Sequence, residues 1–374
     1  MPIAHIIGGG IAGCAAALAL ARIGWQVSVF EKRDGPSSEG AGIQISPNAR
    51  RVLDALEVDL SGQLSFPQRI ELHSANRSAP LAKYELGRDF VRGFGAEYAV
   101  ATRSALQHAL WQKCSEHPDI TMHTGADAAD AGDAHLVVGA DGVASNTRRM
   151  VAKAIPALSS GYIACRAVVA MDDATAAYIP SEAVCLWFGS GAHCVSYPLP
   201  DRKLNLVLSA KGHVETSGWS HAAPTSLADA ILKQLSDRLA PLADGVQFSQ
   251  WDIRSTPVRT PWHHGKTVLI GDAAHAMPPF AAQGSAMALE DAVVLAAELQ
   301  KADNLSEGLK AYGARRRNRV EKVANLARSN AKLYHLSGPM AAARNLALQA
   351  TPETIVNARM GWIYNWQPPD LISA

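Results

Sequence analysis

A glycine cluster near the N-terminus constrains the fold more than any other feature of the sequence. The apolar run Ile3–Ile7 predicts a buried strand, and residues 11–23 predict a helix. Between them stand Gly8, Gly10 and Gly13 in the spacing GxGxxG. In such a turn the first glycine permits the tight bend, the second lets the backbone approach a pyrophosphate, and the third lets the helix pack on the strand.

The next strand adds to the evidence for a pyrophosphate-binding turn. Residues 27–30 read as a strand that ends at Glu31, whose carboxylate can accept hydrogen bonds from ribose hydroxyls and disfavours a 2′-phosphate. Lys32 follows and is a further candidate contact. A glycine-rich turn is the structural alternative, but strand, helix and acid together predict a bound dinucleotide. NAD dehydrogenases and FAD enzymes share this opening, so these residues leave the choice between them open.

Two later apolar runs, residues 136–138 and 267–270, are each followed by glycine and then aspartate, Asp141 and Asp272. Continuous apolar runs suit parallel strands, so we expect all four strands to share one sheet, with Asp272 beside the glycine cluster. Gln283-Gly284 then lead into a helix whose N-terminus can direct backbone N–H groups at an anion.

The middle of the chain has a different character. Short β-rich segments at 162–171, Ala183–Phe188, 194–197 and 204–210 predict an antiparallel sheet, and the segments 286–299, 307–333 and 340–348 predict C-terminal helices. The expected fold class is therefore α/β, with a Rossmann-like parallel-sheet domain interleaved with an antiparallel-sheet domain. In the long helix, the basic run 315–319 is interpreted as one solvated face.

Composition excludes several classes of protein. The 374 residues include 35 basic and 34 acidic side chains, a formal charge of +1, so no global field favours nucleic acid or anionic lipid. Five cysteines without CxxC or metal-ligand spacing argue against a disulfide framework or a metal site. With no leader or membrane span recognised, we expect a cytoplasmic protein, for which a homodimer is a compatible assembly.

Three separated motifs carry a family resemblance. GGGIAG at 8–13, GADG at 139–142 and GDAAHAMPPFAAQGSAMALEDA at 271–292 resemble the single-component FAD-dependent aromatic hydroxylases of the salicylate hydroxylase and 6-hydroxynicotinate 3-monooxygenase type. The likeness covers nearly the whole chain. It implies a discontinuous FAD-binding domain (residues 1–66, 97–158 and 262–374) and a substrate domain (residues 67–96 and 159–261).

The resemblance also implies a set of cofactor contacts. Arg103 and Asp272 would bind the pyrophosphate and ribityl region of FAD, and Asp141 with Gly142 would organise the cofactor and the pyridine nucleotide side. The flavin region would include Gln44, Pro279, Gly284, Ser285 and Ala286, the last standing where many relatives have asparagine. Structural alternatives remain: Arg103 as a first-turn helix residue, and Asp141 as a turn cap. His275 is interpreted as a structural histidine.

Three residues are candidates for binding the substrate and for catalysis. His193 and Tyr197 are four apart in a predicted strand, which places them on one face. The resemblance implies that they orient or deprotonate a phenol-like substrate, since histidine can accept a phenolic proton. Arg166 is a candidate clamp for a carboxylate. Each could instead be an ordinary sheet residue.

The resemblance implies a reaction as well. NAD(P)H, docking transiently, would reduce FAD, and O₂ would then form a flavin C4a-hydroperoxide that hydroxylates a small aromatic substrate. Two other readings remain open at this point: a flavoprotein oxidase or reductase without oxygen insertion, and a non-catalytic binding protein with a dinucleotide fold.

Overall fold

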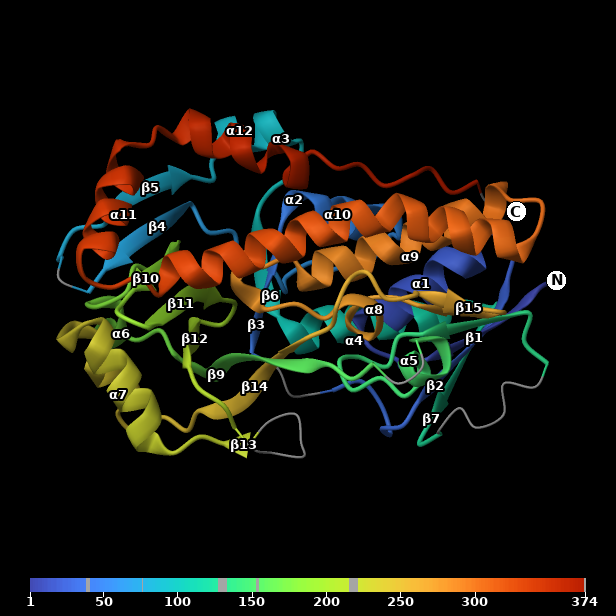
Figure 1. Ribbon diagram of the computed structural model, residues 1–374, viewed down its shortest axis with the longest axis horizontal. Helices are drawn as coiled ribbons and strands as arrows, with labels where there is room; N and C mark the ends of the chain where they lie inside the picture. The colour runs from blue at the N-terminus through green and yellow to red at the C-terminus, as the bar shows by residue number, and fades with distance from the viewer. Residues whose placement is uncertain (38–40, 76, 127–132, 153–154, 215–220, 373–374) are drawn as a thin grey trace.

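The computed structural model describes residues 1–37, 41–75, 77–126, 133–152, 155–214 and 221–372. Two sheets lie at opposite ends of an elongated molecule, and both chain termini lie at the end that holds the parallel sheet (Figure 1). In the described residues, no helix is long and apolar enough to cross a membrane.

The first sheet is built from strands that are far apart in sequence. Its order is β15 (His263–His264), β16 (Thr267–Leu269), β8 (Leu136–Gly139), β1 (Ile3–Ile7), β2 (Gln26–Glu31) and β7 (Ile120–Thr124). All pairings are parallel except β15 with β16. The four strands expected to share one sheet do so, because each is apolar enough to be covered on both faces.

The second sheet has eight strands, in the order β13 (His221–Ala222), β14 (Ser249–Ser255), β9 (Leu158–Ala170), β12 (Lys203–Lys211), β11 (Ala192–Leu199), β10 (Ala183–Phe188), β4 (Arg69–Ser74) and β5 (Ala82–Glu85). The four segments predicted to form an antiparallel sheet, β9, β12, β11 and β10, do so, and β10 also pairs in parallel with β4 on its other side. More than 100 residues separate these two strands, which leaves room for the crossover that a parallel neighbour requires. A two-stranded sheet, β3 (Gly42–Ile45) with β6 (Ala99–Thr102), lies between the large sheets.

Helices cover the sheets. The helices on the parallel-sheet side are α1 (Ile11–Arg22), α2 (Pro47–Ala55), α4 (Arg103–Glu116), α5 (Thr147–Ala152), α8 (Asp272–His275) and α9 (Gly284–Lys301). α7 (Thr225–Leu235) covers the outer face of the second sheet, and the short elements are α3 (Arg88–Phe94), α6 (Asp173–Ala176), η1 (Asp237–Ala243) and η2 (Pro279–Ala281). The five cysteines are free and buried, as expected of small core residues.

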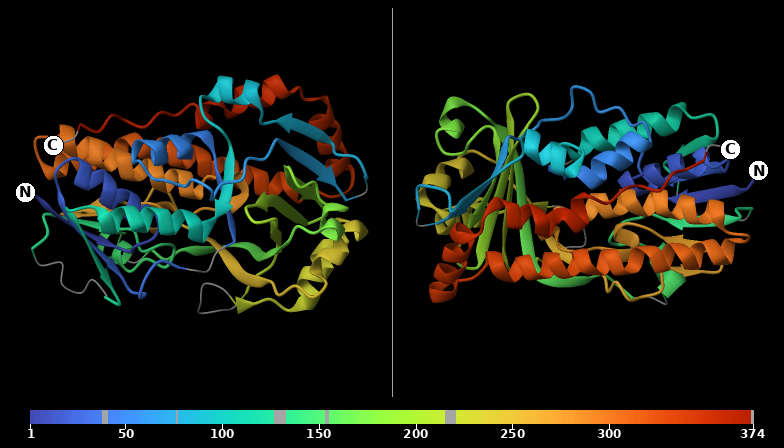
Figure 2. Two further views of the ribbon diagram at one scale, coloured as in Figure 1. Left: turned by 180° about the vertical axis from the view of Figure 1, so that it is seen from behind. Right: turned by 90° about the horizontal axis from the view of Figure 1, so that it is seen from above.

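One helix joins the two halves. α10 (Leu305–Tyr334) has 30 residues, about 45 Å of helix, and runs from the parallel sheet to the second sheet (Figure 2). At its far end the backbone N–H of Gly191, in the turn before β11, donates to the carbonyl of His335. The chain then folds back through α11 (Gly338–Ala350) and α12 (Glu353–Tyr364). The domain boundaries given above stay a prediction.

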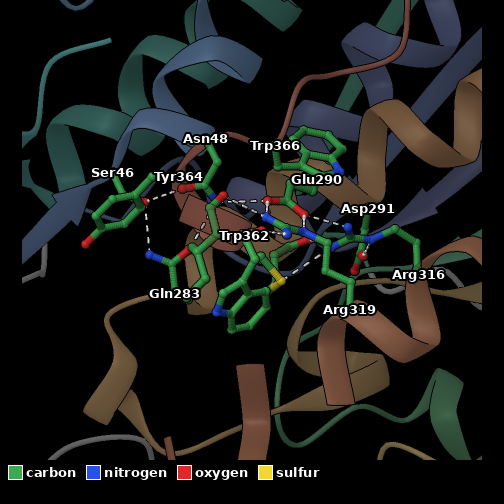
Figure 3. Close-up of polar contacts among 12 residues, drawn as sticks. Ser46, Asn48, Gln283, Glu290, Asp291, Arg316, Arg319, Trp362, Tyr364 and Trp366 are labelled. Carbon is green, nitrogen blue, oxygen red and sulfur yellow. Dashed lines mark hydrogen bonds and ion pairs between the residues drawn. The ribbon is translucent and has the colours of Figure 1, made fainter. Parts of the chain in front are cut away.

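A buried ion cluster joins α9 to α10. Arg316 Nη1 lies 2.5 Å from Glu290 Oε2, and Arg316 Nε lies 2.7 Å from Asp291 Oδ1 (Figure 3). Arg319 Nε lies 2.6 Å from the same oxygen of Glu290. These four residues are called the acid–arginine cluster below. The interpretation of 315–319 as a solvated face is wrong at Arg316, which is 1% exposed, because the two acids on α9 compensate its charge.

The cluster also holds the loops around it. Asp291 Oδ2 accepts from the backbone N–H of Gly271 at 2.9 Å and contacts His275 Nε2 at 2.5 Å. This contact confirms His275 as a structural histidine. On the other side, Asn48 Nδ2 donates to Glu290 Oε1 at 2.8 Å and to Gln283 Oε1 at 3.0 Å. The ends of β16 and β3 and the start of α9 are thereby attached to one buried charge network.

We expect Arg316→Met to lower the free energy of unfolding by about 3–5 kcal/mol, because it leaves two buried carboxylates without their cation. Urea denaturation of the purified protein measures the change. The matched control is Arg315→Met on the same helix, whose exposed ion pair with Glu298 should contribute at most about 1 kcal/mol. Equal losses in the two variants would contradict a dominant role for the buried cluster.

Candidate functional site

One cavity of about 1720 Å³ runs from the glycine cluster to the second sheet. At one end it is lined by Gly8, Gly10 and Glu31, and at the other by Arg166 and His193. Of the seventeen candidate site residues, fifteen line this cavity: Gly8, Gly10, Glu31, Lys32, Gln44, Arg103, Asp141, Gly142, Arg166, His193, Tyr197, Asp272, Pro279, Gly284 and Ser285. Gly13 and Ala286 lie behind its wall, buried.

The glycines of the GxGxxG turn differ in what surrounds them. Gly8 has φ +106°, and a Cβ there would lie 2.6 Å from the carbonyl oxygen of Ala140, the residue after β8. A Cβ on Gly13 would lie 1.8 Å from the carbonyl oxygen of Gly8, so helix and strand meet without room for a side chain. A Cβ on Gly10 would meet no atom within 4 Å. Gly8 and Gly13 therefore serve the packing, whereas Gly10 faces open space.

Glu31 lies at the end of β2, where its carboxylate already has protein partners. Its Oε2 accepts from the backbone N–H of Gly9 at 2.9 Å, and its Oε1 accepts from that of Arg33 at 3.1 Å. Each carboxylate oxygen has a further lone pair that can accept a ribose hydroxyl. Lys32 is exposed at the cavity edge.

The carboxyl ends of β1, β8 and β16 meet at one side of the cavity. Gly271 has φ +56°, and a Cβ there would lie 3.1 Å from Cβ of Ala12 and 3.2 Å from Cβ of Ala288. This close fit places Asp272 beside the glycine cluster, as expected. α9 begins at Gly284 without a side-chain cap, so its first backbone N–H groups are available to an anion in the cavity.

Asp141 has a clear structural role. Its Oδ2 accepts from the backbone N–H groups of Asn146 and Thr147, at 2.9 and 3.0 Å, and from the Thr147 hydroxyl at 3.1 Å. Its Oδ1 is buried without a hydrogen-bond partner among the described residues. Arg103 follows Thr102, whose hydroxyl accepts from the N–H of Ala105 and caps α4. The residue Arg103 itself is exposed.

The strand β3 brings the two halves of the cavity together. The backbone N–H of Gly42 donates to Asn205 Oδ1 at 2.6 Å, and a Cβ on Gly42 would lie 2.4 Å from the ring of Tyr197. Only glycine therefore lets β3 pass beneath β11 and β12. Two residues on, Gln44 lines the cavity and accepts a hydrogen bond from the Tyr98 hydroxyl.

The three substrate-side candidates share the inner face of the second sheet. His193 and Tyr197 alternate with outward residues on β11, and Arg166 reaches the same face through the register Val195↔Val207↔Arg166. Burial raises the pKa of Tyr197, so its phenol stays protonated at neutral pH. Burial, and then the neighbouring His335, hold the pKa of His193 well below its ordinary value. His193 is accordingly neutral.

Arg166 is a cation without a counter-ion among the described residues. Burial lowers its pKa to about 10, which still leaves the guanidinium charged at neutral pH. The group lies 4.0 Å from the ring centroid of Trp251, and its Nε is buried without a hydrogen-bond partner among those residues. A planar cation left unpaired in a cavity wall is suited to a carboxylate that enters from outside.

His335 is a site residue that the sequence reasoning missed. It follows the C-terminal end of α10, and its Nε2 lies 2.7 Å from Nδ1 of His193. No periodicity or spacing connects positions 142 residues apart, so only the packing of α10 on β11 reveals the pair. Trp187 and Phe188 are buried in core clusters of the second sheet.

These residues fit FAD. The open space at Gly10 and the uncapped N-termini of α1 and α9 can hold an anionic group such as a pyrophosphate or a flavin anion, and Glu31 can accept from a ribose. The cavity continues past Gln44 to the sheet, where an isoalloxazine ring and an aromatic substrate could lie together.

Comparisons with known proteins agree with this geometry. The FAD binding domain family matches residues 112–327, and the FAD dependent oxidoreductase family matches residues 4–125. A 3-hydroxybenzoate 6-hydroxylase of Klebsiella oxytoca is 30% identical, covering 99% of this chain and 98% of the relative. A 6-hydroxynicotinate 3-monooxygenase of Pseudomonas fluorescens is 29% identical, covering 88% and 91%.

A solved structure of a salicylate hydroxylase substrate complex superimposes with a TM-score of 0.81 at 20% identity, covering 98% of this chain and 96% of that one, and so shares the fold. Since one family matches more than half of the chain and a relative at 30% identity covers almost all of it, the chain belongs to the FAD-dependent aromatic hydroxylases, flavoprotein monooxygenases that use NAD(P)H.

Proposed function

We propose that this monooxygenase uses O₂ to hydroxylate a small aromatic ring that carries both a phenol-type hydroxyl and a carboxylate. The observation that carries the proposal is Arg166, a buried cation without an anionic partner among the described residues, on the same sheet face as His193 and Tyr197. The relatives named above act, by their names, on 3-hydroxybenzoate and 6-hydroxynicotinate, which are both hydroxylated aromatic carboxylates.

The residues have separate roles in this proposal. Arg166 binds the carboxylate and fixes the orientation of the ring, while neutral His193 accepts the proton of the ring hydroxyl. Loss of that proton raises the electron density of the ring carbon to be hydroxylated. Tyr197, a protonated phenol, donates a hydrogen bond to the substrate oxygen. Bound FAD, reduced by NAD(P)H, supplies the oxygen-activating chemistry.

The chain also contributes apolar walls at the substrate end of the cavity. The substrate end is lined by side chains such as Leu86, Val184, Met360 and Tyr364, from β10, α12 and the segment after β5. Excluding water there strengthens the attraction between Arg166 and a carboxylate. It also limits the loss of activated oxygen as hydrogen peroxide.

We expect Arg166→Gln to raise the KM of carboxylated phenols by about 10- to 100-fold, because a charged hydrogen bond contributes about 1.5–3 kcal/mol. The KM of the matching phenols without a carboxylate should change less than about threefold. NAD(P)H consumption, with product identified by ¹⁸O₂ incorporation, measures both. If FAD retention fell instead, with no change in selectivity between the two substrate sets, Arg166 would belong to the cofactor site.

The acid limb of kcat/KM should lie well below pH 6.5. His193 has a lowered pKa, so its proton-accepting form persists as the pH falls through the range in which an ordinary histidine becomes charged. We expect nearly constant kcat/KM from pH 8 to about pH 6, and a loss of at least about 100-fold in His193→Ala. An acid limb centred near pH 6.5 that disappears in His193→Ala would contradict a neutral, buried histidine.

Gly10→Val should abolish FAD retention without unfolding the protein, because a side chain there enters open space that a pyrophosphate would occupy. The flavin absorbance of the purified variant and its thermal unfolding provide the measurement. The matched variant Gly13→Val should instead destabilise the fold, since its Cβ collides with the backbone at Gly8. Full flavin content in folded Gly10→Val would place the pyrophosphate elsewhere.

A further inference from the structure

The cavity continues beyond the three substrate-side candidates into a part with apolar walls. Six residues from β4, β10 and α12 form this part, called the apolar lobe below: Ile70, Leu72, Val184, Leu186, Val356 and Met360. Among the described residues of β4, β5, β10 and α12 that line the cavity, Glu85 carries the one charged side chain, and it is exposed. The lobe is therefore suited to an uncharged, apolar group.

A row of side chains across the second sheet connects Arg166 to this lobe. The strand register pairs Arg166 on β9 with Val207 on β12, and Val207 with Val195 on β11. It continues from Val195 to Leu186 on β10, and from Leu186 to Leu72 on β4. All five residues line the cavity. Neighbouring strands lie about 4.8 Å apart, so β11 is about 10 Å from β9, and β4 is about 10 Å further on.

The row fixes which part of a substrate faces the lobe. Val195 lies between His193 and Tyr197 on β11, so a ring whose hydroxyl contacts these two residues lies over β11. The guanidinium of Arg166 lies 4.0 Å from the ring centroid of Trp251 on β14, the neighbour of β9 on the side away from β12. The carboxylate of that ring then points away from β10. The opposite side of the ring points toward β10 and β4.

The lobe offers apolar surface that the protein itself leaves partly uncovered. Ile70 and Met360 pack against one buried cluster, and Leu186 and Val356 pack against another. All four nevertheless remain only partly buried, and all four line the cavity. Covering apolar surface is favourable roughly in proportion to its area, so a substrate that reaches the lobe binds more tightly than a single ring.

The wall of the lobe that α12 supplies is held at both ends. Glu353, the first residue of α12, accepts from the backbone N–H of Glu85 at 2.9 Å, and α12 lies beside β5 (Figure 1). At the other end, Arg319 donates to the carbonyls of Trp362 and Ile363, at 2.7 and 3.0 Å. A wall fixed in this way costs little ordering when a ligand binds.

We propose that the substrate carries an apolar side group on the side of its ring opposite the carboxylate, and that the apolar lobe binds this group. The inference rests on the proposed function, because the carboxylate at Arg166 sets the orientation of the ring. It narrows the substrate class from simple hydroxybenzoates to hydroxylated aromatic carboxylates with an alkyl or aryl group. The two strand spacings from β11 to β4 accommodate about six chain carbons at about 1.5 Å per bond.

Binding measurements without turnover test this inference. The probes are 3-hydroxybenzoates with a methyl, propyl or pentyl chain at ring position 4, opposite the carboxylate. The same chains at ring position 6, beside the carboxylate, are the control probes. Each probe is titrated into FAD-loaded, oxidised enzyme, and the change in flavin absorbance gives the dissociation constant. The variants are Leu186→Asn and Met360→Gln, and the matched control is Leu158→Asn, at an exposed leucine of β9 outside the cavity.

We expect each CH₂ added at position 4 to tighten binding by about two- to fourfold, so that the pentyl probe binds about 20- to 200-fold more tightly than the methyl probe. The position 6 series should gain less than about threefold in total. Leu186→Asn and Met360→Gln should each reduce the pentyl advantage by about 5- to 20-fold, with the affinity for 3-hydroxybenzoate changed less than about threefold. Leu158→Asn should match the wild type. If Leu186→Asn fails to fold, Met360→Gln against Leu158→Asn still decides.

Equal affinities along the position 4 series in the wild type would overturn the inference. So would an equal gain in the position 6 series, or a gain that both lobe variants keep, because the chain would then bind elsewhere. A loss in Leu158→Asn as large as in the lobe variants has the same consequence. If the chain gain behaves as expected but no carboxylated phenol, with or without a chain, stimulates NAD(P)H consumption, the proposed function fails while the lobe stands as a binding site.

Discussion

The cofactor cavity depends on the acid–arginine cluster between α9 and α10. Adjacent residues on a helix point about 100° apart, so Glu290 and Asp291 reach different neighbours from one turn of α9. Asp291 fixes the backbone at Gly271, and Glu290 holds Asn48 and, through it, Gln283. Three loops that border the cavity are thus attached to the same buried acids. Arg316 and Arg319 make this arrangement stable, because two buried carboxylates without compensating cations would be costly.

The same helix that supplies those arginines reaches the substrate. Arg319 also donates to the carbonyls of Trp362 and Ile363, so the end of α12 is tied to α10 near the cluster. At its other end α10 places His335 against His193, and Arg344 of α11 donates to the carbonyl of Leu333 at 3.0 Å. One rigid element therefore sets the position of the cofactor loops and of the histidine pair.

Of the four polar side chains discussed at the substrate end, only Arg166 is charged. Burial keeps His193, His335 and Tyr197 uncharged, whereas Arg166 remains a cation even with its lowered pKa. A neutral aromatic ring with one carboxylate matches this arrangement, since its charge compensates Arg166 and its ring packs against apolar walls. A second anion would find no partner there among the described residues, while a cation would be repelled.

Much of the cofactor half followed from local sequence. The glycine spacing, the strand that ends at Glu31 and the apolar runs before Asp141 and Asp272 are short-range patterns whose backbone requirements are the same in any parallel α/β sheet. The limits of the predicted helices and strands differed from the observed ones by at most two residues, except at the start of β9, which begins four residues earlier than predicted. The contacts that local sequence did not reveal are long-range: the parallel pairing of β4 with β10, the burial of Arg316 against α9, and the contact of His193 with His335. Each depends on which distant groups compensate a charge or fill a space, and this is settled only when the chain is packed.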